Sequence, residues 1–201
     1  GYPLCCGRIF DVVETDGGLY ETVTEVMWVT GAALFIRLAD YREVGGLDDH
    51  FFAHMEEIDL CWRLRSRGKK LVCIPQSVVY HVGGATLKKE NPRKTFLNFR
   101  NNLLMLYKNL PDKELEHVLF IRGILDRVAA LVFYLKKDRA NARAVMQARR
   151  EFEDIRYSFA ASRIENIMKS TDEMIPERTH FSILMKYYLL GKKHFSQLKL
   201  F

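Results

Sequence analysis

The segment from residue 45 to residue 63 constrains the fold of this chain more than any other part of the sequence. It begins with a glycine pair typical of a turn and continues through two phenylalanines into three closely spaced acids. Apolar residues then recur at helical spacing, at Leu60, Cys61 and Leu64. The pattern predicts a turn followed by a helix whose first turn carries Glu56, Glu57 and Asp59.

Acids at the start of a helix allow two interpretations. The free backbone N–H groups and the helix dipole stabilise a negative charge there by roughly 0.3–1 kcal/mol per acid, so the three acids could serve helix stability alone. An ionised carboxylate aimed at a pocket can also accept a proton from a hydroxyl group, which is the work of a general base. The local pattern leaves both interpretations open.

A series of motifs around this segment resembles the second half of the family 2 glycosyltransferases, and in particular bacterial members that act on cell-surface polysaccharides. The resemblance extends over roughly residues 1–110, and the motifs occur in the family's order. They are Trp28-Val-Thr-Gly-Ala32 with Arg37, Gly45-Gly-Leu-Asp48, Phe51-Phe52, Glu56-Glu-Ile-Asp-Leu-Cys-Trp-Arg63 and His81-Val-Gly-Gly84. The resemblance implies an α/β chain that forms the carboxy-terminal half of a GT-A sandwich with a mixed sheet.

The resemblance also implies roles for the acids. The family carries Glu-Asp-x-Asp where this chain has Glu56-Glu57-Ile-Asp59, and the second acid is the family's usual catalytic base, so this role falls on Glu57. Glutamate in place of aspartate adds one methylene of reach, which leaves Glu56 as the alternative base. Asp59 and Arg63 belong to the same motif and are therefore candidates for substrate binding. Their spacing of four residues nevertheless favours a structural ion pair on one helix face.

Further site residues follow from the same resemblance. Gly31 and Ala32 match the small-residue step next to the donor sugar or its diphosphate, although tight packing beside a buried strand at residues 34–36 explains them equally well. Asp48 falls near the acceptor cleft, or it stabilises its turn. His81 is a candidate ligand for a divalent metal, Mn²⁺ or Mg²⁺, or else a structural histidine, and Gly83-Gly84 after it would let the backbone approach a ligand. Phe51 and Phe52 are expected in the core or in the wall of the acceptor cleft.

The sequence lacks the metal-binding Asp-x-Asp that the family places upstream of Gly31. We therefore expect a carboxy-terminal piece of a longer inverting enzyme, with little activity of its own. The expected partners are a nucleotide-diphospho-sugar donor and a saccharide or lipid-linked acceptor. Two other functions stay open: a non-catalytic membrane-docking or assembly module, and a nucleotide-sugar hydrolase that uses water as the acceptor.

The character of the sequence changes near residue 90. Residues 1–85 hold 8 Lys and Arg against 12 Asp and Glu, whereas residues 86–201 hold 23 against 13. Short apolar runs at 70–75 and 77–81 predict strands in the first part. Helical spacing predicts helices at 95–109, 115–137, 139–163 and 179–200 in the second. We expect a catalytic half at residues 1–90 and a basic all-helical region at residues 91–201.

The most apolar stretch, residues 118–135, carries charges in its middle, at Arg122, Asp126 and Arg127. Each costs roughly 2.5–3.5 kcal/mol at the centre of a membrane-spanning helix, so a transmembrane span is not expected. An interfacial helix followed by basic residues, or a packed helix with a solvated basic face, fits better. The spread of the basic residues over several helices argues against nucleic-acid binding.

The four cysteines have no metal-ligand spacing and are expected to be reduced thiols. The predicted location is therefore the cytoplasm, with peripheral contact at the inner face of the plasma membrane.

Overall fold

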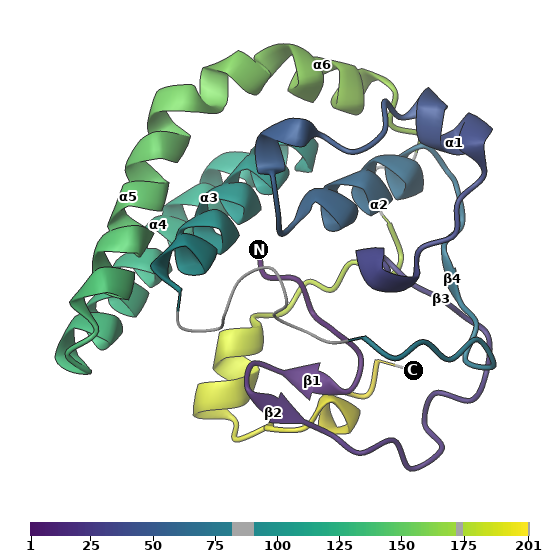
Figure 1. Cartoon of the computed structure of the whole chain (residues 1–201), viewed down its shortest axis with the longest axis horizontal. Coiled ribbons are helices and arrows are strands. Elements are labelled where there is room, and N and C mark those ends of the chain that lie inside the picture. The colour runs from purple at the N-terminus through teal and green to yellow at the C-terminus, as the bar shows by residue number, and fades with distance from the viewer. Residues whose placement is uncertain (82–90, 172–174, 201) are drawn as a thin grey trace.

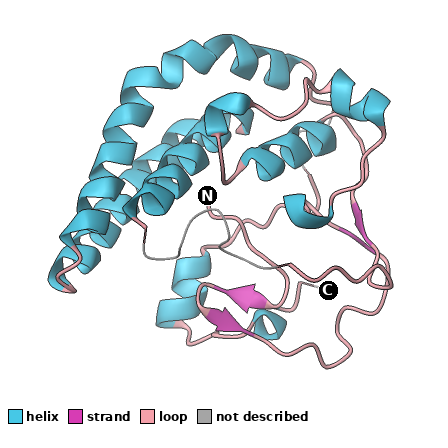
Figure 2. Cartoon of the chain, in the orientation of Figure 1, coloured by secondary structure: helices cyan, strands magenta, loops and turns pink. Residues whose placement is uncertain are grey.

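The computed structural model describes residues 1–81, 91–171 and 175–200, and these residues form a mixed α/β structure dominated by helices (Figure 2). The longer helices are α1 (Leu38–Glu43), α2 (Glu56–Ser66), α3 (Pro92–Asn109), α4 (Asp112–Leu135), α5 (Arg139–Ile155) and α6 (Ala160–Met168). The short helical turns are η1 (Gly31–Ala33), η2 (Asp49–Phe51), η3 (Arg156–Phe159), η4 (Met185–Leu189) and η5 (Phe195–Leu198). The strands are β1 (Arg8–Ile9), β2 (Val12–Val13), β3 (Thr24–Glu25) and β4 (Val72–Cys73).

The described strands form two separate two-stranded sheets, and both are antiparallel. β1 pairs with β2, with Arg8 opposite Val13, and β3 pairs with β4, with Thr24 opposite Cys73. No parallel pairing occurs in the described ranges, so the mixed sheet of the expected sandwich is not formed by these residues. The α/β character is confirmed, but the sheets are small.

Helices α3, α4 and α5 pack together as a bundle, and α6 continues the arc of α5 over the top of the molecule (Figure 1). Local signals set their starts. The side chain of Asn91 accepts a hydrogen bond from the N–H of Arg93, 2.9 Å away, and Pro92 occupies the first helical turn of α3, where its missing N–H costs nothing. Asp138 caps α5 in the same manner through the N–H of Asn141, at 3.1 Å.

The main core joins the two parts of the chain on either side of residue 90. It packs Phe51 and Trp62, from η2 and α2, against Leu103, Leu104 and Phe152 of the bundle. The helical region therefore does not stand away from the acidic segment but forms one side of its packing. This arrangement places α3 directly against the turn that leads into α2.

Two smaller clusters complete the packing. Val44, Leu60 and Leu64 hold α1 against α2. Ile9 packs with Phe195 and Leu198, so the β1–β2 hairpin lies beside the last turns of the chain (Figure 1).

The structure confirms two of the predicted helices and corrects the other two. The helices expected at 95–109 and 115–137 lie in α3 and α4. The helix expected at 139–163 is interrupted by η3, and Arg163 of α6 donates hydrogen bonds to the carbonyls of Tyr107 and Leu110 that hold α6 against the end of α3. The helix expected at 179–200 is wrong. Gly191, at a φ of +66°, breaks that segment, which packs irregularly on the hairpin.

The strand predictions are largely wrong, because an apolar run becomes a strand only where a partner strand is available. Of the run at 70–75, Val72–Cys73 alone is paired. The run at 77–81 forms no strand, and its side chains at Val78, Val79 and Tyr80 are exposed. The buried strand expected at 34–36 is also absent, since Phe35 is 92% exposed.

Candidate functional site

The backbone between η2 and α2 is unusually strained. Phe52, His54 and Met55 all have positive φ values, of 60°, 71° and 75°, although none of them is glycine. Phe52 stands at the centre of a γ-turn, in which the N–H of Ala53 donates to the carbonyl of Phe51 at 2.7 Å. Such conformations cost about 1–3 kcal/mol each and persist only where the surroundings fix them. Strain of this kind is concentrated at ligand-binding and catalytic sites.

A single side chain holds this strained turn. The Nδ2 of Asn101, on α3, lies 2.8 Å from the carbonyl oxygen of Phe51, 2.9 Å from that of Ala53 and 2.8 Å from that of His54. Asn101 is fully buried. The turn is therefore fixed from outside by α3, and α2 begins directly after it.

We expect Asn101→Ala to lower the free energy of unfolding by about 1–3 kcal/mol, because three backbone carbonyls lose their buried donor. The matched control is Asn98→Ala on the same helix, since among the described residues Asn98 donates to the carbonyl of Lys94, in its own helix, and to no other group. Urea unfolding of both variants measures the difference. Equal, small losses would show that Asn101 does not fix the turn.

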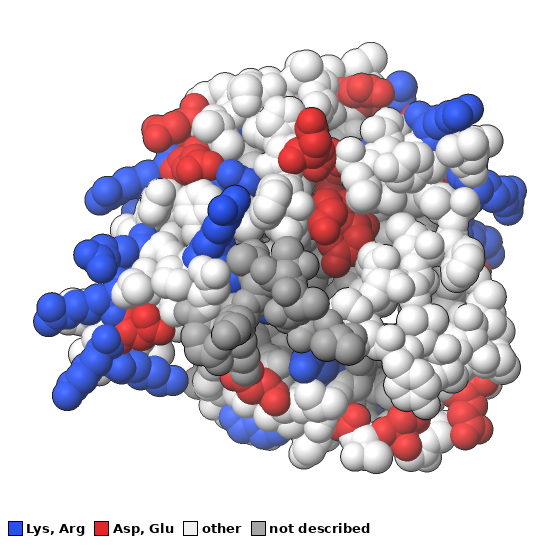
Figure 3. Space-filling view, in the orientation of Figure 1, with Lys and Arg blue, Asp and Glu red and all other residues white. Residues whose placement is uncertain are grey.

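The three acids lie in the first turn of α2, as predicted, and two of them carry an oxygen without a partner in the described part of the chain. The Oε2 atoms of Glu56 and Glu57 are buried and have no hydrogen-bond partner within residues 1–81, 91–171 and 175–200. Burial, and then the negative charge of Glu56, raise the pKa of Glu57 above its ordinary value, although backbone N–H groups partly oppose this shift. Figure 3 shows acidic side chains grouped over η2 and the start of α2. Glu57 is thus a carboxylate with a proton-accepting oxygen to spare.

His54 is a third unpartnered group at the same place, and the sequence analysis missed it. Its Nε2 is buried without a partner in the described part of the chain. Burial, together with the nearby charge of Lys94, lowers the pKa of His54, so its imidazole is neutral at neutral pH. Nothing in the motif singles out this histidine, which precedes Glu56 by two residues, has a positive φ and feels the charge of Glu56.

Gly31 lies next to Glu57, which the sequence alone could not show. A Cβ atom added to Gly31 would lie 3.7 Å from the Cβ of Glu57. Gly31 and Ala32 belong to η1, which the side chain of Thr30 caps through the N–H of Ala32, and both residues are exposed. The alternative of tight packing beside a buried strand is therefore wrong, and the two small residues are exposed next to the Cβ of Glu57.

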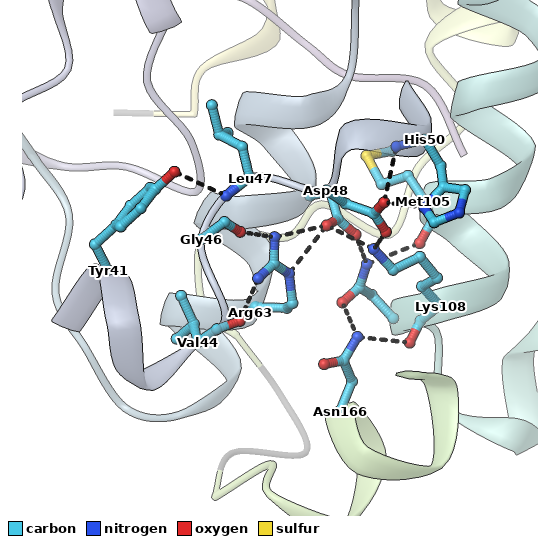
Figure 4. Close-up of polar contacts among 12 residues, drawn as sticks. Tyr41, Val44, Gly46, Leu47, Asp48, His50, Arg63, Met105, Lys108 and Asn166 are labelled. Atoms are coloured by element: carbon cyan, nitrogen blue, oxygen red, sulfur yellow. Dashed lines mark hydrogen bonds and ion pairs between the residues drawn. The ribbon is translucent and has the colours of Figure 1, made fainter. Parts of the chain in front are cut away.

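Asp59 and Arg63 form the predicted structural pair, and both are buried. The Nε of Arg63 donates to Asp59 at 2.9 Å. The two terminal nitrogens of Arg63 donate to the carbonyls of Val44 and Gly46 (Figure 4). From α3, Lys108 donates to Asp59 at 2.9 Å and Asn109 donates to it at 2.7 Å. Both side chains of the pair are fully used within the chain and fix the glycine turn and α3 to α2.

Asp48 belongs to the same network. Lys108 donates to Asp48 at 2.7 Å, and the backbone N–H and the ring Nδ1 of His50 contact its other oxygen at 3.1 Å and 2.8 Å. Burial opposes ionisation of Asp48, but the hydrogen bond and charge of Lys108 and the hydrogen bonds of His50 outweigh it and lower the pKa of this carboxyl. The predicted turn-stabilising role is confirmed, since Asp48 caps η2.

The described residues do not build a metal centre around His81. His81 is exposed, and Gly83-Gly84 after it lie outside the described residues. The residues that the structure describes contain one group of three potential ligands within 4.8 Å of one another, formed by Asp48, Asp49 and His50. Both oxygens of Asp48 in this group are already bonded to Lys108 and His50. His81 alone therefore supplies at most one ligand.

A hollow of about 260 Å³ lies at the other end of α2, among Trp62, Asn109, Pro111, Asn166 and Arg178. None of the catalytic, substrate-binding or metal-binding residues predicted from the sequence lines this hollow. The proton-accepting groups, and not this hollow, mark the candidate site.

Comparison with known proteins finds glycosyltransferases. The chain is 31% identical over 141 residues to the pre-mycofactocin glycosyltransferase of Mycobacterium tuberculosis. The matched stretch covers 65% of this chain and 29% of that protein. It is 38% identical over 56 residues to the N-acetylglucosaminyl-diphospho-decaprenol L-rhamnosyltransferase of the same organism, covering 28% of this chain and 18% of that protein. It is 36% identical over 58 residues to the rhamnosyltransferase WbbL of Escherichia coli, covering 29% of this chain and 22% of that protein.

The chain thus spans less than a third of the length of these relatives. No family model matches the chain, and no solved structure matches it significantly. The relatives are all transferases of sugars, in agreement with the resemblance carried by the acidic motif, and this chain is accordingly a distant relative of bacterial glycosyltransferases.

Proposed function

We propose that this chain forms the acceptor side of an inverting, nucleotide-sugar-dependent glycosyltransferase, with Glu57 as the general base. The observation that carries the proposal is the free, buried Oε2 of Glu57 at the start of α2, beside the exposed Gly31. The strained turn at residues 52–55 and its clamp by Asn101 support it, because a catalytic carboxylate must be held in a fixed position. The names of the relatives agree with this reaction class.

In the proposed reaction an acceptor hydroxyl donates its hydrogen bond to Oε2 of Glu57. The proton moves to that carboxylate while the hydroxyl oxygen forms a bond to the anomeric carbon of the donor sugar. The bond from this carbon to the diphosphate breaks on the opposite face, and the nucleoside diphosphate leaves with the electron pair. A single displacement of this kind inverts the anomeric configuration and needs no covalent intermediate.

The environment of Glu57 suits this role. A general base works best when its pKa lies near the working pH, and burial and the charge of Glu56 move the pKa of Glu57 in that direction. Glu56 also has a free buried oxygen and is the alternative base. Asp59, Arg63 and Asp48 hold the surrounding elements in place, which is a positioning role in this proposal.

The remaining parts of the proposal concern the donor. Gly31 and Ala32 would face the donor sugar or its diphosphate, because both residues are small and exposed and Gly31 lies next to the Cβ of Glu57. A divalent cation, Mn²⁺ or Mg²⁺, would neutralise charge on the departing diphosphate, with His81 as one of its ligands.

A GT-A fold and a saccharide or lipid-linked acceptor complete the proposal. One relative's name includes a decaprenol-linked substrate, which supports the second of these acceptors.

The test is nucleotide release by the native protein that contains this chain, with a panel of UDP-, GDP- and dTDP-sugars, in Mn²⁺, in Mg²⁺ and in a chelator. We expect metal-dependent release with one donor class, together with a glycosylated acceptor when a mixture of saccharides and lipid-linked sugars is added. Release of free sugar without a glycosylated product would indicate the hydrolase instead. Neither binding nor release across the panel would contradict an enzymatic role and favour a docking or assembly module.

A further inference from the structure

Two charged residues in the middle of helix α4 lie on the inside of the molecule. Arg122 and Asp126 are buried in the bundle, where Arg122 donates to Asp126 at 3.0 Å and Arg149 of α5 donates to Asp126 at 2.9 Å. Arg122 also donates to the carbonyl of Gly1 at 2.7 Å. An ion-pair network therefore holds the inward face of α4 together with the buried apolar residues Leu115, Leu119 and Ala130. None of the helices in the described part of the chain could span a membrane.

The outward face of α4 is apolar. Phe120 and Leu135 are each 70% exposed, and Ile124 and Val128 are each 51% exposed. The exposed apolar residues of this helix are Phe120, Ile121, Ile124, Val128, Leu131, Val132, Tyr134 and Leu135. Their spacing of three and four residues places them along one stripe about 24 Å long. We name these eight residues the α4 stripe. Arg127, which is exposed, lies within it and donates to the carbonyl of Gly123 at 2.7 Å. An exposed apolar surface of this size marks an interaction site.

Basic residues follow the α4 stripe directly. Lys136, Lys137 and Arg139 are exposed at the turn between α4 and α5, and Arg143 is exposed one turn later. Figure 3 shows Lys and Arg side chains projecting from the end of the molecule where α5 begins in Figure 1. The acids in this part of the chain, from residue 118 to residue 143, are Asp126, which is buried, and Asp138, which is bonded to Asn141. The stripe therefore ends in a positively charged tip.

We propose that the α4 stripe is a docking surface for an anionic lipid bilayer. The helix would lie in the plane of the interface, with the stripe at the boundary between headgroups and acyl chains and the basic tip on the headgroups. The charge pattern favours this occupant over a second copy of the chain. Antiparallel packing about the middle of the stripe would place Arg127 against the same residue of the second copy, and parallel packing would bring the two basic tips together. The inference goes beyond the proposed reaction and does not depend on it.

Vesicle sedimentation of the purified chain tests the inference, with phosphatidylcholine vesicles alone and mixed with phosphatidylglycerol. We expect binding that prefers the anionic vesicles by about tenfold or more, because each basic residue at the surface adds to the attraction. The variant Ile124→Gln/Val128→Gln should lose binding to both kinds of vesicle. The variant Lys136→Gln/Lys137→Gln should lose the preference for anionic vesicles, and added salt should act in the same way.

Two matched variants control for loss of apolar or basic surface in general. Ile164→Gln/Met168→Gln removes two exposed apolar residues of α6 at the same spacing, and Arg37→Gln/Arg42→Gln removes two exposed basic residues near α1. Both should bind vesicles like wild type, and circular dichroism checks that every variant is folded. Absent vesicle binding would overturn the inference, as would binding that the control variants reduce equally. A dimer that the Ile124→Gln/Val128→Gln variant dissociates, with no vesicle binding, would assign the stripe to self-association.

Discussion

Asp59→Asn is expected to lower the free energy of unfolding by about 3–5 kcal/mol, because it removes one partner of a buried, charged network. Asp59 is fully buried and accepts hydrogen bonds from Arg63, Lys108 and Asn109. All three contacts are donors, so an amide NH₂ group in place of one carboxylate oxygen would face other donors. Lys108 would also be left with Asp48 alone, and Arg63 would lose the carboxylate with which it forms its ion pair among the described residues.

Urea unfolding at neutral pH measures this effect, and Asp49→Asn is the control. Asp49 also stands before α2, but its side chain is 98% exposed and contacts only the ring of His50, so its replacement should change stability by less than about 0.5 kcal/mol. Lys108→Met tests the same buried network from the side of α3, since it removes the cation that joins Asp48 to Asp59. A loss of less than about 1 kcal/mol for Asp59→Asn would mean that the network is not the main link between α2 and α3.

The parts of the fold that local signals determine could be predicted from the sequence. Helix α2 follows from its first-turn acids and its apolar spacing. Helix α3 follows from its apolar spacing, although it begins at Pro92, three residues before the predicted start. The sequence failed where structure depends on a distant partner. The run at 77–81 has no partner strand among the described residues, and the segment at 179–200 is shaped by the β1–β2 hairpin on which it packs.

Helix α4 shows a different limit of the pattern. Its apolar residues were expected either at an interface or in a packed bundle. The hydrophobic pattern cannot say which face turns inward when charged residues can pair with one another across helices, as Arg122, Asp126 and Arg149 do. Only the structure shows that the α4 stripe faces outward.

The candidate site was predictable in its acids but not in its supports. Glu56, Glu57 and Gly31 were identified from motifs, and the structure brings Gly31 to Glu57. His54 and Asn101 were missed because positive φ values at non-glycine residues leave no mark in the sequence. A signal for Asn101 did exist: it shares the buried face of α3 with Leu97, Leu104 and Met105 at helical spacing. A polar residue on an apolar helix face must find a buried partner, and here it is the strained turn.

Glu57→Gln is expected to reduce turnover of the native protein by about 10²–10⁴-fold, which is the usual contribution of a general base. The amide keeps the size of the side chain but cannot accept the acceptor's proton. Glu56→Gln is the matched control, since its carboxylate also has a free buried oxygen one residue away. If Glu56→Gln were the inactive variant and Glu57→Gln the active one, the base would be Glu56. If both variants turned over like wild type, neither acid would be the base.

The pH dependence separates this catalytic loss from a structural one. Burial and Glu56 raise the pKa of Glu57, so the wild-type rate should fall on the acid side at a higher pH than for an ordinary glutamate. A raised carboxyl pKa in the folded state means that folding favours the protonated acid; this contribution to stability is present below the unfolded pKa and is lost as the pH rises through the folded pKa. Glutamine does not ionise, so Glu57→Gln should be at least as stable as wild type at neutral pH, with the difference closing below about pH 4. An inactive variant with undiminished stability would identify Glu57 as a residue kept for chemistry at a cost to the fold, whereas a variant that lost both together would return Glu57 to the role of a helix-starting acid.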